Sequence, residues 1–227
     1  VPKLNALDFD VYGWDMAGHG RSPGARGVAD LRNAVADHRA ARAKLKDKPL
    51  FVFGHSLGGL VSAASVAEDQ GGVAGVVLSA PALAISAPAH LRAIAGFAAL
   101  IAPGARLVPP LDPEGLSRIP EEVAAYKSDP MISDTRVPAK TGATAIDISE
   151  AAWARYADWR TPTLVLHGEQ HRATDPNGSK RFIEAIPAAD KRLVLYPEGR
   201  HELLNDLERD AAWDEISAWL RQRAAQG

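Results

Sequence analysis

A single serine between two glycines is the strongest candidate for chemistry in this sequence. Gly54 and Gly58 flank Ser56 at a distance of two residues, and the apolar residues 51–53 precede them. A serine at the tip of a sharp strand-to-helix turn adopts strained backbone angles, and glycine at the flanking positions lets the turn close. Such a turn presents the hydroxyl at a helix N-terminus and directs the backbone N–H of Leu57 at an oxyanion. The pattern predicts Ser56 as a nucleophile; the alternative is an ordinary strand, loop and helix with a capping serine.

A serine hydroxyl is a weak nucleophile at neutral pH, so it needs a base within hydrogen-bonding reach. Seven histidines are available. His38 is expected within a helix and His90 within residues 84–149, each in a packing or solvent-exposed role. His19 and His55 are expected in structural hydrogen bonds. His201 differs because it follows the last expected strand, where the base stands in the chain order typical of this turn. We therefore predict His201 as the general base.

Short apolar segments alternate with amphipathic helical segments over most of the chain. This alternation predicts a mostly parallel, doubly wound α/β sheet with its active site at the carboxyl ends of the strands. Strands are expected at 9–15, 50–53, 73–80, 162–168 and 192–196, and helices at 30–46, 178–186 and 207–223.

The alternation stops between residues 84 and 149. An apolar stripe over residues 91–101 is followed by a proline-rich link and a more polar segment, 116–133. We expect one core, formed by residues 1–83 and 150–227, and a cap inserted between them. The stripe either faces the core or forms an apolar surface of the cap that receives an apolar substrate.

Composition narrows the possible functions. The 26 basic and 28 acidic residues nearly balance, which gives no electrostatic reason to expect a nucleic-acid partner. The absence of cysteine excludes disulfides, thiol catalysis and Cys-ligated metal sites. No signal peptide and no run of about 18 apolar residues is visible. We expect a cytoplasmic protein that uses neither a metal nor an organic cofactor.

Several motifs together resemble the monoacylglycerol lipase/lysophospholipase branch of the α/β-hydrolases, the serine aminopeptidase S33-like (hydrolase_4) group. The resemblance covers nearly the whole chain and rests on residues 18–22, 54–59, 116–118 with 126–130, 167–168 and 199–205. It implies an α/β-hydrolase fold with residues 84–149 as the lid. It also implies cleavage of monoacylglycerol to fatty acid and glycerol through an acyl-enzyme on Ser56, with His201 as base. Lysophospholipids and short-chain esters are alternative substrates.

The sequence departs from this family at the acid of the triad. The family has Asp at the last position of His-Gly-x-x-Asp, whereas this chain has His171 there. An imidazole cannot stabilise the imidazolium that His201 must become, and loss of the acid costs on the order of 10⁴ in kcat in serine proteases. Asp175 is the nearest substitute and Glu169 the next. The alternative function is therefore a non-catalytic relative that binds acyl ligands.

A second departure concerns the start of the sequence. The family begins with a strand hairpin, a third strand and a His-Gly loop that supplies the other oxyanion N–H, and nothing here fills that role. Without the third strand, the strands at 9–15 and 50–53 would carry unpaired backbone groups in a buried setting. We expect about 40–50 further residues, from the same or another polypeptide, to complete the sheet. Transient contact of the cap with a membrane surface is a further expectation.

Overall fold

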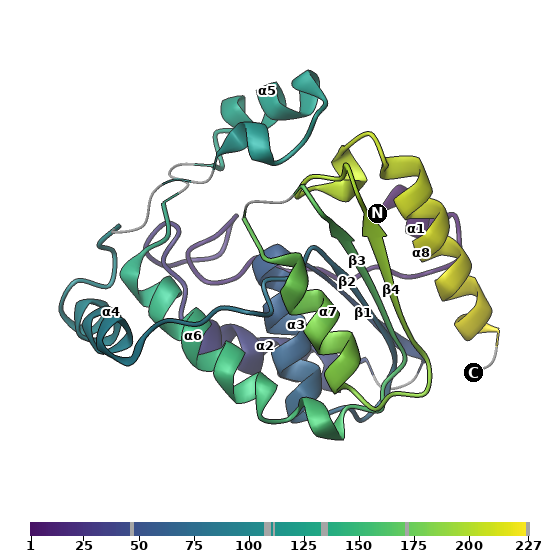
Figure 1. The fold of residues 1–227 in the computed structure, drawn as a ribbon, viewed down its shortest axis with the longest axis horizontal. Coiled ribbons are helices and arrows are strands. Elements are labelled where there is room, and N and C mark those ends of the chain that lie inside the picture. The colour runs from purple at the N-terminus through teal and green to yellow at the C-terminus, as the bar shows by residue number, and fades with distance from the viewer. Residues whose placement is uncertain (46–47, 107–109, 111, 133–135, 171–172, 226–227) are drawn as a thin grey trace.

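A four-stranded parallel sheet forms the centre of the molecule (Figure 1). The computed structural model describes residues 1–227 except 46–47, 107–109, 111, 133–135, 171–172 and 226–227. The strands lie side by side in chain order and are β1 (Leu50–His55), β2 (Val73–Ser79), β3 (Thr163–Gly168) and β4 (Lys191–Tyr196). All six residues of β3 are buried, as is typical of a parallel strand covered on both faces. The expected α/β class and these four strands are confirmed.

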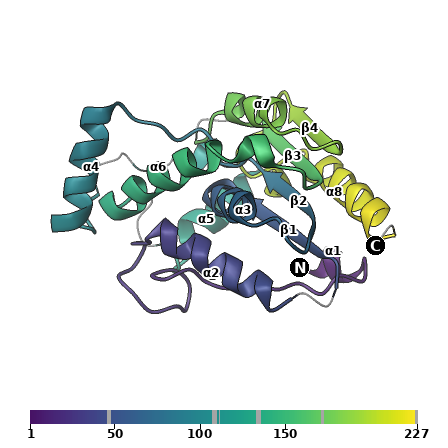
Figure 2. The ribbon, with the colours of Figure 1, turned by 90° about the horizontal axis from the view of Figure 1, so that it is seen from below.

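Helices cover both faces of the sheet, which gives three layers (Figures 1 and 2). One face carries α2 (Leu31–Ala43), α3 (Ser56–Glu68), α6 (Ala139–Trp153) and α7 (Pro176–Ala185). The other carries α8 (Arg209–Ala224), whose Ile216 and Trp219 are buried against the sheet, and the short α1 (Pro2–Asn5). The single-turn 3-10 helices are η1 (Pro113–Gly115), η2 (Tyr156–Asp158) and η3 (Leu203–Asn205).

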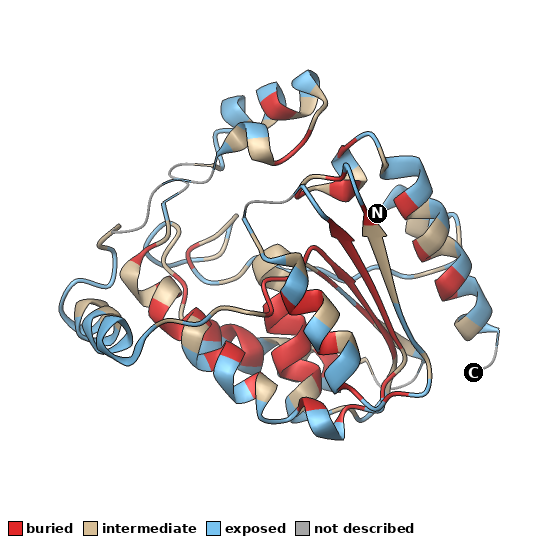
Figure 3. Ribbon diagram, in the orientation of Figure 1, coloured by how far each residue is buried: buried red, intermediate tan, exposed pale blue. Residues whose placement is uncertain are grey.

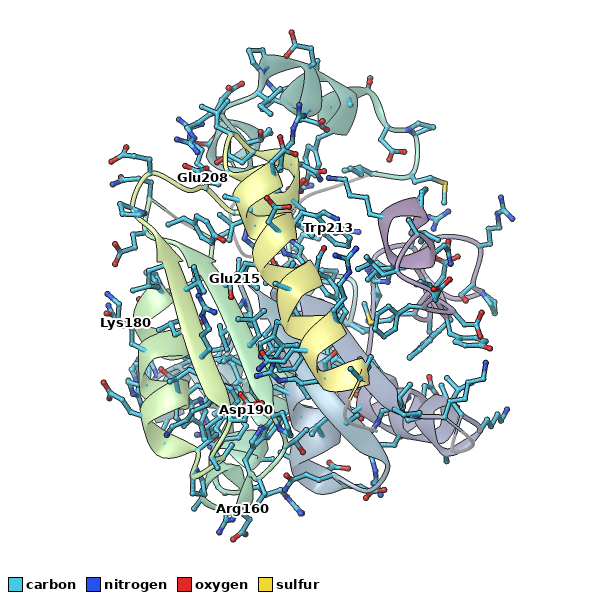
Figure 4. The ribbon with its side chains drawn as sticks, turned by 90° about the vertical axis from the view of Figure 1, so that its right-hand side faces the viewer. Arg160, Lys180, Asp190, Glu208, Trp213 and Glu215 are labelled. Atoms are coloured by element: carbon cyan, nitrogen blue, oxygen red, sulfur yellow. The ribbon has the colours of Figure 1, made fainter. Side chains whose placement is uncertain are left out.

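Helix α3 is largely buried, and many of its side chains are small. It lies between α2 and α6 and has eight buried residues, among them Gly59, Ala63 and Ala64. Small side chains let the helix backbone approach the sheet closely, which fixes the N-terminus of α3 relative to the end of β1. Helix α8 covers the opposite face with larger side chains such as Trp219, and Figure 4 views the molecule from the side of that helix.

Helix α6 belongs to the packed body of the protein although most of it lies in the expected insertion. Thr141 and Thr144 of α6 accept hydrogen bonds from the backbone N–H groups of Ala29 and Leu31, at 2.9 and 3.0 Å. These contacts hold the start of α2 against α6. The expected boundary after residue 149 therefore falls inside a helix that packs on α2 and α3.

The strand expected at 9–15 is wrong, because this segment has no regular secondary structure. It is held by aromatic side chains: Phe9 packs edge-on against Phe51, with ring centroids 5.7 Å apart, and Trp14 lies 5.4 Å from His38. A strand requires a partner for its backbone groups. Within the described ranges no segment pairs with the outer edge of β1.

Adjoining hollows of about 390 and 470 Å³ lie between residues 9–14 and the outer edge of β1. Their walls include Phe51, Phe53 and Leu50 of β1 and His38 and Arg42 of α2. Phe53 is 42% exposed although it lies in the middle of a strand. We refer to these hollows as the β1 groove.

The expected insertion contains two helices outside the core. Helix α4 (Ala89–Ile101) contacts α6 but has no buried residue, and Figure 3 shows it exposed at the periphery. The core-facing interpretation of the apolar stripe is therefore wrong. Helix α5 (Pro120–Ser128) follows later in the insertion and lies above the carboxyl ends of β3 and β4 (Figure 1). No helix within the described part of the chain has the length and apolar composition needed to span a bilayer.

Candidate active site

The turn at Ser56 has the backbone geometry expected of a nucleophile elbow. Strand β1 ends at His55 and α3 begins at Ser56, with no residue between them. Ser56 has a φ of 52°, a left-handed conformation that is uncommon for residues with a Cβ. Its carbonyl accepts a hydrogen bond from the N–H of Ala82 at 3.0 Å. Because Leu57 lies in the first turn of α3, its N–H has no acceptor within the helix and suits an oxyanion.

Close packing explains one of the two glycines in the motif but not the other. A Cβ on Gly54 would lie 2.7 Å from Ser62 Oγ and 2.8 Å from the Gly58 carbonyl oxygen, so only glycine fits. A Cβ on Gly58 would meet nothing within 4 Å, because Gly58 borders the β1 groove. The expectation that both glycines are needed for space is wrong in this structure. The second close contact instead involves Gly59, whose Cβ would lie 2.7 Å from Pro81 Cβ.

The imidazole of His201 lies next to the end of β1. His201 is only 4% exposed, and its ring centroid is 4.6 Å from that of His55, with an angle of 41° between the ring planes. His55 directly precedes Ser56. The structure thus brings the predicted base and the predicted nucleophile to the same carboxyl edge of the sheet, where active sites of parallel α/β proteins are found.

His55 makes a structural hydrogen bond, as expected, and it also lies beside the predicted base. Its Nδ1 lies 3.1 Å from the carbonyl oxygen of Ser79, so Nδ1 carries the hydrogen and donates it. Burial lowers the pKa of His55, and this effect outweighs the opposing influence of the Glu202 charge and the Ser79 hydrogen bond. A neutral His55 allows the neighbouring His201 to accept a proton without facing a second positive charge.

The two candidate carboxylates near the expected acid position are both engaged elsewhere. Asp175 is exposed and caps α7 by accepting the N–H of Asn177 at 2.9 Å. Glu169 pairs with Lys180 of α7 at 3.1 Å. His171 lies outside the described residues. The assignment of Asp175 as the acid therefore stays a prediction, and its visible function is that of a helix cap.

The buried His167 organises the loop after β3. Its Nδ1 lies 2.8 Å from Ser179 Oγ, and its Nε2 lies 3.2 Å from Thr174 Oγ. The Thr174 hydroxyl donates to the Ala80 carbonyl at 3.1 Å, so Nε2 of His167 donates to Thr174 and Nδ1 accepts from Ser179. This chain of hydrogen bonds connects the loop after β3 to the end of β2.

Two other histidines are used structurally, as expected. His19 Nδ1 lies 3.1 Å from the Ala17 carbonyl oxygen. His38 Nδ1 lies 2.8 Å from Ser65 Oγ, and burial together with the charge of Arg42 lowers its pKa to about 4. With this low pKa, the His38 ring is not suited to accept a proton near neutral pH.

Gly168, Gly199 and the buried Asp206 hold the loop that carries His201. Gly168 and Gly199 are in such close contact that a Cβ on Gly168 would overlap the Gly199 carbonyl group. The fully buried Asp206 accepts the backbone N–H of Arg200 at 3.0 Å and also binds Arg118 of the insertion. Arg118 belongs to one of the family motifs, but Asp206 had no distinguishing signal in the sequence. Across the described residues, no three His, Asp or Glu side chains gather as a possible metal site.

The chain order of these elements, with the serine after β1 and the histidine after β4, is that of the α/β-hydrolases. The fold and the elbow define this class of protein. The chain belongs to the Hydrolase_4 family (serine aminopeptidase, S33), whose sequence profile matches residues 1–208.

Several proteins similar to this chain in sequence or structure are named monoacylglycerol or monoglyceride lipases. A monoacylglycerol lipase of Mycolicibacterium smegmatis is 35% identical over 96% of this chain and 80% of its own length. The human monoglyceride lipase is 30% identical over 98% of this chain and 76% of its own length. The crystal structure of Paleococcus ferrophilus monoacylglycerol lipase has a TM-score of 0.88 and 35% identity, covering 97% of this chain and 86% of that one.

The two glycines of the elbow provide a matched test of its packing. Gly54→Ala should lower the free energy of unfolding by about 1–3 kcal/mol, because the new methyl group overlaps backbone and side-chain atoms. Gly58→Ala should leave it unchanged or raise it by up to about 1 kcal/mol, because it replaces a helical glycine that faces open space. Urea unfolding of both variants measures this difference. Equal destabilisation by the two substitutions would contradict the packing described for the elbow.

Proposed function

We propose that this protein is a serine hydrolase that cleaves carboxylic esters of single-acyl lipids, most directly monoacylglycerol to fatty acid and glycerol. The observation that carries the proposal is the His201 imidazole lying 4.6 Å from the ring of the residue before Ser56. The lipase names of similar proteins supply the substrate class. Lysophospholipids and short-chain esters are the alternative substrates, which a series of acyl lengths and head groups distinguishes.

The reaction follows from the roles proposed for these groups. Ser56 Oγ attacks the ester carbonyl while His201 takes the hydroxyl proton, and the N–H of Leu57 donates to the oxyanion. The tetrahedral intermediate collapses to an acyl-enzyme, and His201 passes the proton to the departing glycerol oxygen. Water, deprotonated by His201, then releases the fatty acid. Asp175 is the proposed acid, and it would have to leave its cap position on α7 to orient His201.

A non-catalytic protein that binds acyl ligands is the second candidate. It is favoured by one observation, the engagement of Asp175 and Glu169 with α7 rather than with His201. Such a protein would retain affinity for monoacylglycerol without turning it over. The hydrolase and the non-catalytic protein would therefore both bind monoacylglycerol, but only the hydrolase would turn it over.

Substitution of the nucleophile separates these candidates. Ser56→Ala and His201→Ala should each lower kcat for monoacylglycerol by on the order of 10⁴-fold or more, because each residue is needed for the same proton-coupled attack. His19→Ala, which removes a half-buried histidine bound to a backbone carbonyl, serves as the matched control and should retain kcat. Release of fatty acid measures all four proteins. Unchanged turnover in Ser56→Ala would rule out the proposed nucleophile, and wild-type binding without turnover would favour the second candidate.

Helix α4 is the proposed contact with a membrane surface, where single-acyl lipids reside. Its Leu100 is 80% exposed and its Phe97 63% exposed, and Leu91, Ile94 and Ile101 are exposed beside them. An unpartnered apolar helix surface of this kind commonly inserts at the lipid boundary. We infer a peripheral protein whose cap receives substrate from the bilayer.

The membrane proposal predicts a specific loss of vesicle binding. Phe97→Glu and Leu100→Glu should each weaken binding to phosphatidylcholine vesicles about tenfold or more, because burial of one such side chain contributes about 1.5–3 kcal/mol. Val1→Glu changes a 73% exposed apolar residue outside the cap and should have little effect. Vesicle co-sedimentation measures the binding. Equal binding by all three variants would contradict the assignment of α4.

We also propose that a further extended polypeptide segment pairs with β1 along the β1 groove. The groove has an apolar wall that includes Phe53, and it also contains Arg42, which is 8% exposed. The Arg42 Nη2 binds the carbonyls of Ser65 and Asp69, but Nε and Nη1 have no partner among the described atoms. An added strand would supply carbonyl oxygens as acceptors for these Arg42 donors, and its N–H and C=O groups would pair with the edge of β1.

Amide hydrogen exchange tests whether the β1 edge is open. In the 227-residue chain, amides of β1 should exchange faster than those of β3, because β1 is paired on one side and β3 on both. Mass spectrometry of peptides that span the two strands measures the rates. Equal protection of β1 and β3, with no other polypeptide present, would show that the backbone groups at the β1 edge are already hydrogen-bonded. That result would contradict the proposal.

A further inference from the structure

The insertion is joined to the loop of His201 through one buried carboxylate. Asp206 is fully buried, and its Oδ1 accepts the backbone N–H of Arg118 at 2.7 Å. Its Oδ2 accepts the Arg118 Nη2 at 2.9 Å and the backbone N–H of Arg200 at 3.0 Å. Arg200 directly precedes His201. A single side chain therefore fixes the residue before the proposed base to a residue of the cap.

Further hydrogen bonds join the same two segments. Ser117 Oγ donates to the Asn205 carbonyl at 2.6 Å, and the N–H of Glu202 donates to the Leu116 carbonyl at 2.9 Å. The guanidinium group of Arg200 donates to the carbonyl of Ser117 at 3.2 Å and to that of Glu114. These bonds hold the chain on both sides of His201.

The charge of Asp206 depends on this arrangement. Burial opposes its ionisation, but hydrogen bonds from the Arg118 side chain and from the backbone N–H groups of Arg118, Arg200 and Leu207 outweigh burial and lower its pKa. The guanidinium of Arg118 also contacts Glu208, which Figure 4 shows at the start of α8. A buried ion that is fully hydrogen-bonded has few alternative arrangements, so it defines one position of the loop.

We propose that Arg118 and Asp206 are positioning residues that hold the His201 loop against the cap so that the imidazole faces Ser56. This inference rests on the proposed function, because it assigns the pair a role through His201. A displacement of about 1 Å in a catalytic group can cost on the order of 10²-fold in rate. The cap therefore contributes to the reaction by fixing the base.

A purely structural pair would behave differently. If Arg118 and Asp206 only stabilise the fold, their replacement should lower the melting temperature without changing the rate of the folded enzyme. If they position His201, replacement should lower kcat while KM stays nearly constant, because substrate contacts are retained. Arg118→Lys should restore only part of the rate, because lysine keeps the charge but lacks the forked donors.

The experiment measures the rate at which a fluorophosphonate labels Ser56, together with kcat and KM for monoacylglycerol. Asp206→Asn and Arg118→Ala should reduce the labelling rate and kcat on the order of 10²-fold, with KM changed less than about twofold. Lys127→Ala removes an exposed ion pair with Glu114 in the same part of the cap and serves as the control. Ser117→Ala removes only the hydroxyl bonds to residues 119 and 205 and should lower kcat severalfold.

The outcomes are distinct. Normal labelling and kcat in folded Asp206→Asn and Arg118→Ala, with slow labelling in His201→Ala, would overturn the positioning role alone. Where the two charge variants do not fold, a Ser117→Ala rate equal to wild type would overturn it as well. Equal labelling of wild type and His201→Ala would show that His201 is not the base, and both the proposed function and this inference would then fail.

Discussion

The left-handed backbone of Ser56 is the constraint on which the site depends. A residue with a Cβ in this conformation costs roughly 1–3 kcal/mol and persists only where its surroundings leave no alternative. Here β1 fixes the chain before Ser56, α3 fixes it afterwards, and the N–H of Ala82 binds its carbonyl. The close approach at Gly54 permits this geometry. The hydroxyl is consequently held at the carboxyl edge of the sheet instead of being free to rotate with a loop.

The surroundings of His201 combine a neutral neighbour with a fixed loop. Burial keeps His55 uncharged, so the imidazolium form of His201 meets no like charge from the ring beside it. Buried Asp206 stays ionised because Arg118 and backbone N–H groups bind it. The first effect concerns the charge next to the proposed base, and the second concerns the position of that base. Both depend on residues that do not touch the reacting atoms.

Much of the fold could be predicted from the sequence because β-α alternation and the elbow motif are local patterns. The four strands of the sheet and the helices α2, α7 and α8 lie where their apolar periodicity indicated. The segment at 9–15 had the composition of a strand, but strand formation also requires a partner, which composition does not report. The apolar stripe of α4 likewise showed amphipathicity without showing whether its apolar face meets the core or solvent.

The site was predicted only in part, for related reasons. Ser56 and His201 were predicted from motif and chain order, whereas His55 and Asp206 lie beside the His201 loop through contacts between distant segments. Gly54 and Gly58 are equivalent in the sequence motif, yet only the structure shows that the space around Gly58 is open. Long-range hydrogen bonds such as that between residues 118 and 206 produce no periodic pattern in a sequence, so they could not be predicted.

Trapping of the acyl-enzyme tests the central claim most directly. A p-nitrophenyl ester should give a burst of p-nitrophenol, and acid quenching during the burst followed by peptide mass spectrometry should find the acyl group on Ser56. An acyl group on a different residue, or steady ester cleavage with no covalent adduct at any time, would contradict the account.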